Sequence, residues 1–266
     1  MTATRETAVA GQFYPGNASE LSTTVQVLLD EACPQDGPPP KALIVPHAGY
    51  IYSGPVAAAA YARLQPYRHL YTRVILLGPC HRVAVSGIAL SRADAFRTPL
   101  GDVPLDKEAI ATLDRPEVTF MDNAHELEHC LEVHLPFLQA VIESFSLVPL
   151  IVGDVATETV SQVIDTLWGG PETLIVVSSD LSHYLSYDEA QASDKATCQA
   201  IENLQAASID HDDACGATPI GGLLIATKRR GMKVTTLDLR NSGDTAGDRS
   251  FVVGYGAWIF REEDGE

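Results

Sequence analysis

The feature that most constrains this chain is an apolar run that stops abruptly at a histidine-containing turn. Three stretches share this arrangement: 42–45 ahead of His47, 73–77 ahead of His81, and 173–177 ahead of His183. Short apolar runs bounded by glycine and proline are typical of buried strands. Ligands of open α/β sheets bind beyond the carboxyl ends of such strands. We therefore expect the three strand ends to meet at one metal-binding pocket.

Strand and helix patterns alternate along the rest of the chain. Asn17 or Ser19 is positioned to cap a first helix, and proline-rich residues 34–40 then connect it to the first strand. Further helices are expected at 55–64, 106–113, 125–145 with a kink or a division at Pro136, 160–167, 190–204 and from Gly221-Gly222 onward. Further strands are expected at 88–91, 147–152, 234–239 and 251–260, with a hairpin at 96–105. The alternation predicts one α/β domain over residues 1–266, with a mostly parallel or mixed sheet flanked by helices.

Composition excludes several functional classes. The 266 residues carry 18 Lys and Arg against 35 Asp and Glu, a net charge of −17, and no basic stripe. Nucleic acid binding, which needs clustered cations, is therefore not expected. Five dispersed cysteines without a C-x-x-C pair favour reduced thiols. The first residues lack a signal-peptide pattern and no stretch is long enough to span a membrane, so we expect a cytoplasmic protein.

His47 and His81 are the first candidates for metal ligands, because each follows a predicted strand in a turn with glycine or proline. Asp244, in a glycine-rich loop after a later strand, is the strongest carboxylate candidate. Two histidines and one carboxylate suit non-haem Fe(II), although Zn or Mn also accept this set. The alternative for Asp244 is an ordinary Asx turn.

Asp180 and His183 lie on one short loop and suggest acid–base chemistry. A carboxylate-supported imidazole near a metal could transfer protons. The same residues with Ser178 or Ser179 could form a Ser-His-Asp hydrolase, but the chain has no G-x-S-x-G elbow. A simple capping role for Asp180 is the remaining alternative.

A rival motif is His125-Glu126-Leu127-Glu128-His129, which matches H-E-x-x-H. On a helix this spacing brings two histidines together with a glutamate base, as in zinc hydrolases. No glycine or third histidine follows at the positions that extended versions of the motif require. A polar helix face turned to solvent or to a pocket also explains the pattern.

Several motifs together resemble the Memo family, whose prokaryotic members are called AmmeMemoRadiSam system protein B. These motifs are Gly11-Gln12-Phe13-Tyr14, 46–54, 77–81, 96–101, 128–137 and 178–183. The family is similar in fold to class III extradiol ring-cleaving dioxygenases. The resemblance implies a pocket lined by His47, His81, His183 and Asp244, with Phe13 and Tyr52 as aromatic walls.

The resemblance also implies cofactors and partners. Eukaryotic Memo proteins are linked to copper or iron binding, and they carry a cysteine that we align with Asp244. A carboxylate there favours Fe(II), with Cu or Zn as alternatives. Cys80 would place a thiol beside His81, and His129 would be a pocket residue. We expect either an Fe(II) oxidoreductase acting on a small molecule, such as an aromatic compound, or on a peptide, or a metal-holding protein acting with radical-SAM and AMMECR-type partners.

Overall fold

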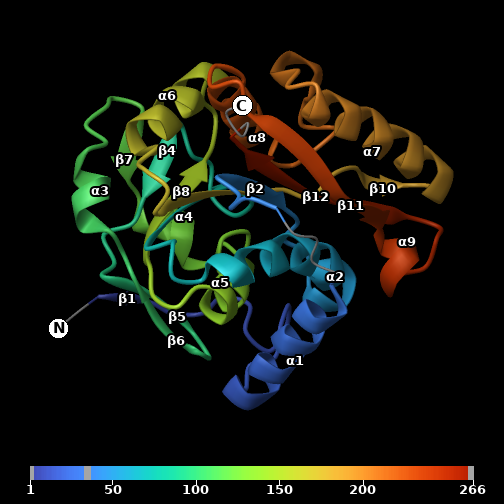
Figure 1. Ribbon diagram of the computed structural model, residues 1–266, viewed down its shortest axis with the longest axis horizontal. Coiled ribbons are helices and arrows are strands. Elements are labelled where there is room, and N and C mark those ends of the chain that lie inside the picture. The colour runs from blue at the N-terminus through green and yellow to red at the C-terminus, as the bar shows by residue number, and fades with distance from the viewer. Residues whose placement is uncertain (1–2, 33–36, 263–266) are drawn as a thin grey trace.

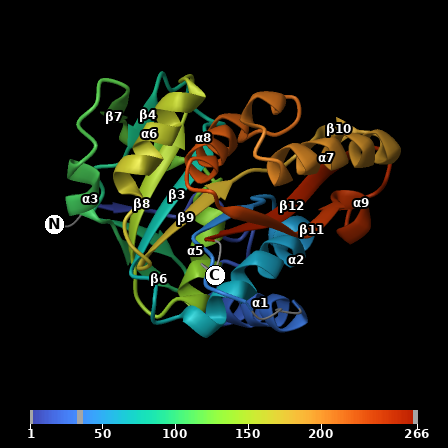
Figure 2. The same cartoon turned by 45° about the horizontal axis from the view of Figure 1, so that its top comes forward.

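A computed structural model of the chain describes residues 3–32 and 37–262. Its centre is a mixed β-sheet between two layers of helices (Figures 1 and 2). The strands are β2 (Ala42–Val45), β3 (Arg73–Pro79), β4 (Ile88–Leu90), β7 (Val118–Phe120), β8 (Ser146–Val152), β9 (Thr173–Ser178), β10 (His183–Leu185), β11 (Lys233–Asn241) and β12 (Val252–Arg261). Within the described ranges these nine strands run in the order β10-β12-β2-β9-β3-β8-β4-β7, and β11 pairs with the other side of β12.

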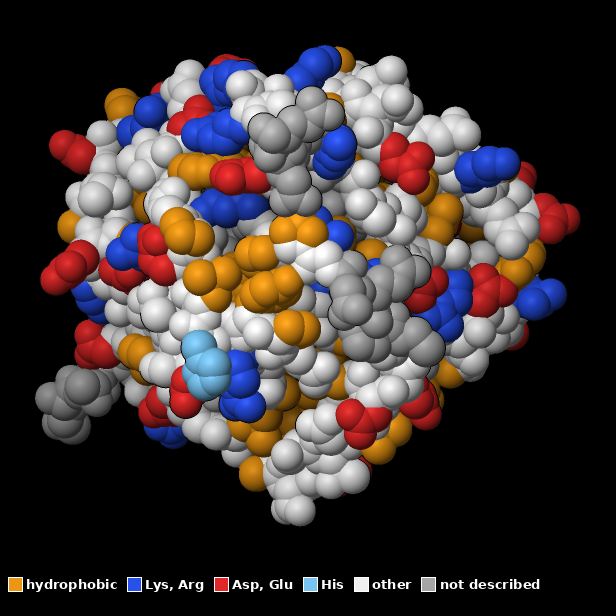
Figure 3. All heavy atoms as spheres, in the orientation of Figure 1, with side chains coloured by type: hydrophobic (Ala, Val, Ile, Leu, Met, Phe, Trp, Pro, Cys, Tyr) orange, Lys and Arg blue, Asp and Glu red, His pale blue; other side chains and the backbone are white. Residues whose placement is uncertain are grey.

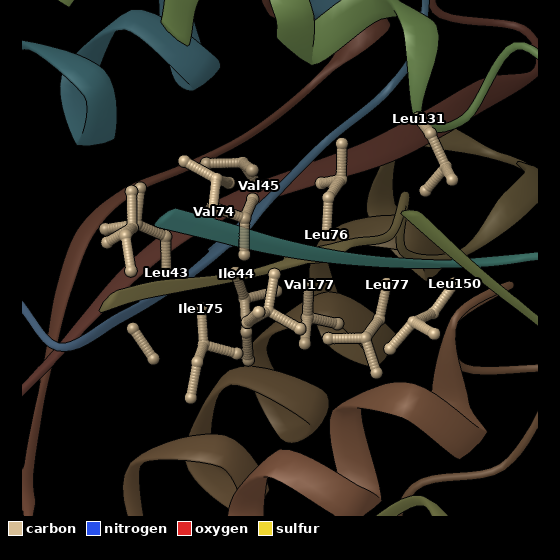
Figure 4. Packing of buried hydrophobic residues seen from close by; sticks show 14 of the residues in the cluster. Leu43, Ile44, Val45, Val74, Leu76, Leu77, Leu131, Leu150, Ile175 and Val177 are labelled. Carbon is tan, nitrogen blue, oxygen red and sulfur yellow. The ribbon is translucent and has the colours of Figure 1, made fainter. Parts of the chain in front are cut away.

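The parallel strands β2, β9 and β3 lie side by side in the middle of this sheet. Val45 at the end of β2 pairs with Ser178 at the end of β9, and β3 flanks β9 on its other side. Figure 4 shows why they are buried: Val74 and Leu76 point to one face of the sheet, and Ile175 and Val177 to the other. Strands covered on both faces are expected to be continuous apolar runs, as these are. The carboxyl ends of three neighbouring strands therefore open at one edge.

Helices cover the two faces in separate groups. One group contains α6 (Thr157–Leu167), α7 (Tyr187–Glu202) and α8 (Ala217–Lys228), and the other contains α1 (Ala18–Glu31), α2 (Tyr50–Tyr61) and α5 (Leu135–Val141). Both views place these groups on opposite sides of the sheet (Figures 1 and 2). α8 packs on β3 and β9, while α2 packs on β2, β11 and β12.

A small second sheet fastens the N-terminal segment to the body of the fold. It consists of β1 (Thr4–Arg5), β5 (Ala95–Thr98) and β6 (Gly101–Pro104), in the order β1-β5-β6. From β1, the buried Arg5 side chain forms an ion pair with the buried carboxylate of Glu132. Glu132 also accepts hydrogen bonds from the backbone amides of Ala8 and Val9 at 2.7 and 3.0 Å and from the hydroxyl of Tyr14. This buried carboxylate is thereby surrounded by donors, as a buried charge requires.

The predicted α/β architecture with a flanked mixed sheet is confirmed, and Asn17 caps α1 by accepting from the amides of Ser19 and Glu20. Three helix predictions were wrong in detail. α2 starts at Tyr50, so Pro55 lies inside the helix, and Gly221-Gly222 likewise lies inside α8. The predicted helix 125–145 is divided, but at 127–131 and not at Pro136, into α4 (Asp122–Glu126), the 3-10 turn η2 (Glu132–His134) and α5.

The remaining elements are short. They are α3 (Lys107–Ala111), capped by Asp106 as expected, α9 (Ser242–Thr245) in the predicted loop after β11, and the 3-10 turns η1 (Ala62–Tyr67) and η3 (Ala206–Ser208). Within the described ranges, no helix combines the length and the apolar character that crossing a membrane would need. Cys33 and the first part of the proline-rich connector fall outside the described residues, and the four described cysteines are free thiols.

Lys and Arg are interspersed with Asp and Glu on the face seen in Figure 3, with a patch of hydrophobic side chains near its middle. A basic stripe is absent from that face.

Candidate metal centre

Two imidazoles and a thiol meet at the carboxyl ends of the central strands. His47, His81 and Cys215 each offer one ligand atom, and these atoms all lie within 4.8 Å of one another. His47 Nε2 is 3.4 Å from Cys215 Sγ. A tetrahedral ion with nitrogen at about 2.0 Å and sulfur at about 2.3 Å would separate the two donors by roughly 3.5 Å. The described donor set therefore fits a transition-metal ion.

His47 is held by the neighbouring strand β9. Its backbone amide donates to Asp180 Oδ1 at 2.8 Å, and its Nδ1 lies 2.6 Å from Ser178 Oγ. The residue is 2% exposed. Burial lowers the pKa of His47 well below the usual range, and the neighbouring histidines lower it further, so the ring is neutral and able to act as a ligand.

His81 is held by a carboxylate. Glu128 Oε2 accepts from the His81 amide at 2.6 Å, and Oε1 lies 2.9 Å from His81 Nδ1. Because an ionised carboxylate only accepts, Nδ1 carries the proton and Nε2 is left free for a metal. Burial raises the pKa of Glu128, but contacts with His129 and His81 outweigh it and hold the pKa well below its usual range. This is the carboxylate–histidine arrangement found behind many metal ligands.

Cys215 lies on the loop that enters α8. The Cys215 amide donates to the Asp180 carbonyl at 3.3 Å, and the next amide, of Gly216, donates to Ser179 Oγ at 2.9 Å. A Cβ at Gly216 would lie 2.7 Å from the Ser179 Cβ, so only glycine allows the loop to approach β9 this closely. Burial and the charge of Asp180 raise the pKa of Cys215 to about 12. A metal would have to displace the thiol proton.

His129 and Phe13 form one wall beside these donors. The ring of His129 lies 4.8 Å from that of His81 and 5.4 Å from that of His47, and Phe13 packs edge-on against His129 at 4.9 Å between centroids. His129 also forms a second possible metal-binding group with His81 and Glu128. Its Nδ1 is 3.1 Å from Glu128 Oε1 but is not aligned for a hydrogen bond.

The chain is similar in sequence to known proteins over almost all of its length. The family model described as "Memo-like protein" matches residues 5–259. The chain belongs to the Memo family. A MEMO1 family protein of Aquifex aeolicus is 37% identical, with 96% of this chain and 98% of the relative covered. One from Methanopyrus kandleri is 36% identical, with 97% and 99% covered.

A solved structure supports the fold. The crystal structure of the uncharacterized protein JW3007 from Escherichia coli K12 is similar with a TM-score of 0.50, covering 80% of this chain and 98% of that chain. At 13% sequence identity this similarity supports the fold alone.

Asp244, expected as the third ligand of this Memo-family site, lies elsewhere. It belongs to α9, where its carboxylate accepts from the Tyr187 hydroxyl at 2.5 Å and from the Asn241 amide at 3.2 Å. β11, which leads to it, is parallel to β2 but separated from it by β12. Two strand spacings amount to about 10 Å. The carboxyl end of β11 therefore lies at the same edge of the sheet as that of β2, but too far to the side for Asp244 to join the metal donors. We replace Asp244 by Cys215 as the candidate third ligand.

Asp180 contacts the His47 backbone, but no described hydrogen bond joins it to His183, its predicted partner. Asp180 is 5% exposed, and burial raises its pKa although His47, His183, His129 and His81 all favour its charged form. The structure describes no hydrogen bond between Asp180 and His183, whose side chain is exposed at the start of β10. The acid–base role of His183 therefore stays a prediction.

The H-E-x-x-H match does not form a zinc site. α4 ends at Glu126, so the five residues do not share one helix. His125 is buried, with its Nε2 3.0 Å from the Ala89 carbonyl and its ring against Phe96. Glu126 is exposed. The shared Memo-family part, Glu128 and His129, is the part that faces the metal donors.

Two further predicted residues are Tyr52 and Cys80. Tyr52 is 39% exposed, and a Cβ built on Gly49 would lie 3.9 Å from Tyr52 Cδ2 and 3.5 Å from the Phe13 carbonyl. Cys80 is half-buried beside His81.

Cys215 is one of the five dispersed cysteines of the sequence, and it was not predicted as a metal ligand. Its only local signal is a glycine directly after it and a helix soon after.

Proposed function

We propose that this chain binds one transition-metal ion through His47, His81 and Cys215 and uses it as an oxidoreductase on a small substrate. The observation that carries the proposal is the convergence of three ligand atoms within 4.8 Å. The donors are softer than two histidines and a carboxylate, so the preference for Fe(II) that rested on Asp244 no longer holds alone. We propose Fe(II) or Cu(I) as the ion, with Zn(II) as the alternative.

Two groups of residues surround the donors: one orients the metal ligands, and the other would contact a substrate. Glu128 and Ser178 orient the two imidazoles, and Asp180 fixes the backbone on which His47 lies. A bound ion would supply a Lewis acid and a redox partner for a substrate. Phe13 and His129 offer an aromatic wall, which favours a small aromatic substrate of the extradiol-dioxygenase type. His183, whose side chain is exposed, is the candidate for moving protons.

Metal content of the purified chain tests this proposal. We expect about one iron or copper per chain, retained in Asp244→Asn and lost in a His47→Ala and His81→Ala double variant. Oxygen uptake with catechols, measured on the same samples, would follow the metal. Full metal content in the double variant would overturn the ligand set.

One observation favours a second function, metal holding without turnover. His183 lacks a described hydrogen bond to Asp180, so a preformed proton-transfer pair is not in place. In that case the metal would bind with the same stoichiometry and no substrate would raise oxygen uptake. Association with radical-SAM and AMMECR-type proteins, implied by the family resemblance, would then be the activity to measure.

A further inference from the structure

We propose that Ser178 locks His47 in the tautomer that metal binding requires, and that His134 and Tyr61 complete this lock. The inference rests on the proposed function, because it assigns a role to three residues behind the metal centre. Within the described residues, none of them offers a donor atom to the group of His47, His81 and Cys215. They are positioning residues.

The hydroxyl of Ser178 has one proton and two lone pairs, and the surroundings assign all three. Its oxygen lies 2.7 Å from the Cys130 carbonyl, which only accepts, so the serine proton points there. The same oxygen lies 2.6 Å from His47 Nδ1 and 2.8 Å from His134 Nε2. Both nitrogens must therefore donate to it. For neutral His47, a proton on Nδ1 leaves the lone pair on Nε2, the atom 3.4 Å from Cys215 Sγ.

His134 obtains its tautomer from the other side. Its Nδ1 lies 2.9 Å from the Tyr61 hydroxyl, which can donate to it if His134 is protonated on Nε2. His134 and Tyr61 are fully buried, and burial together with the nearby His129 lowers the pKa of His134 to about 3. The chain Tyr61, His134, Ser178, Cys130 carbonyl is thus satisfied at every atom by one arrangement of protons.

The two imidazole ligands are held by unlike groups as a result. Glu128, a carboxylate, faces His81 Nδ1, whereas a neutral hydroxyl faces His47 Nδ1. A carboxylate makes an imidazole more basic, so His81 should be the stronger electron donor. The hydroxyl fixes orientation and tautomer without adding charge.

Long-range proton–nitrogen NMR on the chelator-stripped chain reads the tautomer without any metal. We expect His47 to be protonated on Nδ1 in the natural sequence. Ser178→Ala should give a mixture of tautomers, and Ser178→Thr, which retains the hydroxyl, should restore the single form. A His47 protonated on Nε2 in the natural chain would overturn the proposal. An unchanged tautomer in Ser178→Ala would overturn the role of Ser178.

Metal affinity, measured by competition with a chelator, gives a second readout. Ser178→Ala should weaken Fe(II) or Cu(I) binding by roughly 10- to 100-fold. Tyr61→Phe, which removes a single oxygen, should weaken it by roughly 2- to 10-fold. Tyr71→Phe is the matched control, because this buried tyrosine donates to the Pro40 carbonyl at 2.6 Å, before β2 and away from the donors.

The outcomes separate this inference from the proposed function. If Ser178→Ala does not fold, the Tyr61→Phe and Tyr71→Phe pair decides, and equal affinities in the two would overturn the role of Tyr61. If His47 has the expected tautomer and loses it in Ser178→Ala, while the natural chain binds neither Fe(II) nor Cu(I), the lock stands and the proposed function fails.

Discussion

At the scale of single residues, Cys215 is the candidate ligand that replaces Asp244 in the metal centre. Its sulfur is 3.4 Å from His47 Nε2, whereas Asp244 is engaged by Tyr187 and the α9 cap. Neither placement can be read from the sequence, because a ligand's position depends on which strands are neighbours and not on which strands share a direction. The three strand ends that carry histidines could be predicted, because apolar runs and turns are local signals in the sequence.

Cys215→Ser should therefore abolish stoichiometric metal binding, and Asp244→Asn should not. A serine hydroxyl is a much poorer ligand for a soft ion than a thiolate. Metal content after dialysis measures both variants. Loss of metal from Asp244→Asn with retention in Cys215→Ser would restore the original ligand set.

Binding of a metal should also release a proton from Cys215. Burial and Asp180 raise the pKa of this thiol to about 12, so it is protonated in the metal-free chain at neutral pH. Adding the ion in weakly buffered solution should acidify it by about one proton per site, and the apparent affinity should rise with pH. Proton release that persists undiminished in Cys215→Ser would contradict this assignment.

At the scale of elements, β1 holds the loop that carries Glu128 and His129. Arg5 donates to the carbonyls of His125 and Glu128 as well as to the carboxylate of Glu132. The backbone break after α4, which the periodicity of the sequence did not predict, lies in this same loop. Leucine spacing predicted a helix over 125–145, kinked or divided at Pro136, whereas the break lies at 127–131, in the segment whose carbonyls at His125 and Glu128 accept from Arg5.

Arg5→Met should reduce the free energy of unfolding by about 3–5 kcal/mol, because it leaves a buried carboxylate without its cation. Chemical denaturation measures the loss. The control is Arg97→Met, since Arg97 makes exposed ion pairs with Glu6 and Asp102 and should contribute far less. Equal losses of unfolding free energy in the two variants would show that the buried ion pair contributes no more to stability than the exposed ones.

At the scale of the whole molecule, the α/β class and most strands follow from apolar runs that a two-sided sheet requires. The assignment of residues 1–266 to one domain stays a prediction. The order of the sheet could not be predicted, because it depends on contacts between residues far apart in the chain. That order is what brings β2, β9 and β3 together and leaves β11 two strands away.

Stability of the metal-free chain should fall between pH 6.5 and pH 4. Burial lowers the pKa of His134 to about 3 and that of His125 to about 4, so the unfolded chain binds these protons first. The contribution of the two neutral histidines to the free energy of unfolding is complete above pH 6.5 and is lost as the pH falls. Asp194, whose pKa burial raises to about 6, acts in the opposite direction.

Urea unfolding across this pH range measures the slope, and His125→Asn should flatten it. A slope that is the same in His125→Asn and in the natural chain would remove His125 from the explanation.

X-ray absorption spectroscopy of the iron- or copper-loaded chain identifies the atoms bound to the metal. We predict one sulfur neighbour at about 2.3 Å together with two imidazoles, and loss of the sulfur in Cys215→Ser. A first shell of nitrogen and oxygen alone in the natural chain, or a sulfur that persists in Cys215→Ser, would contradict it.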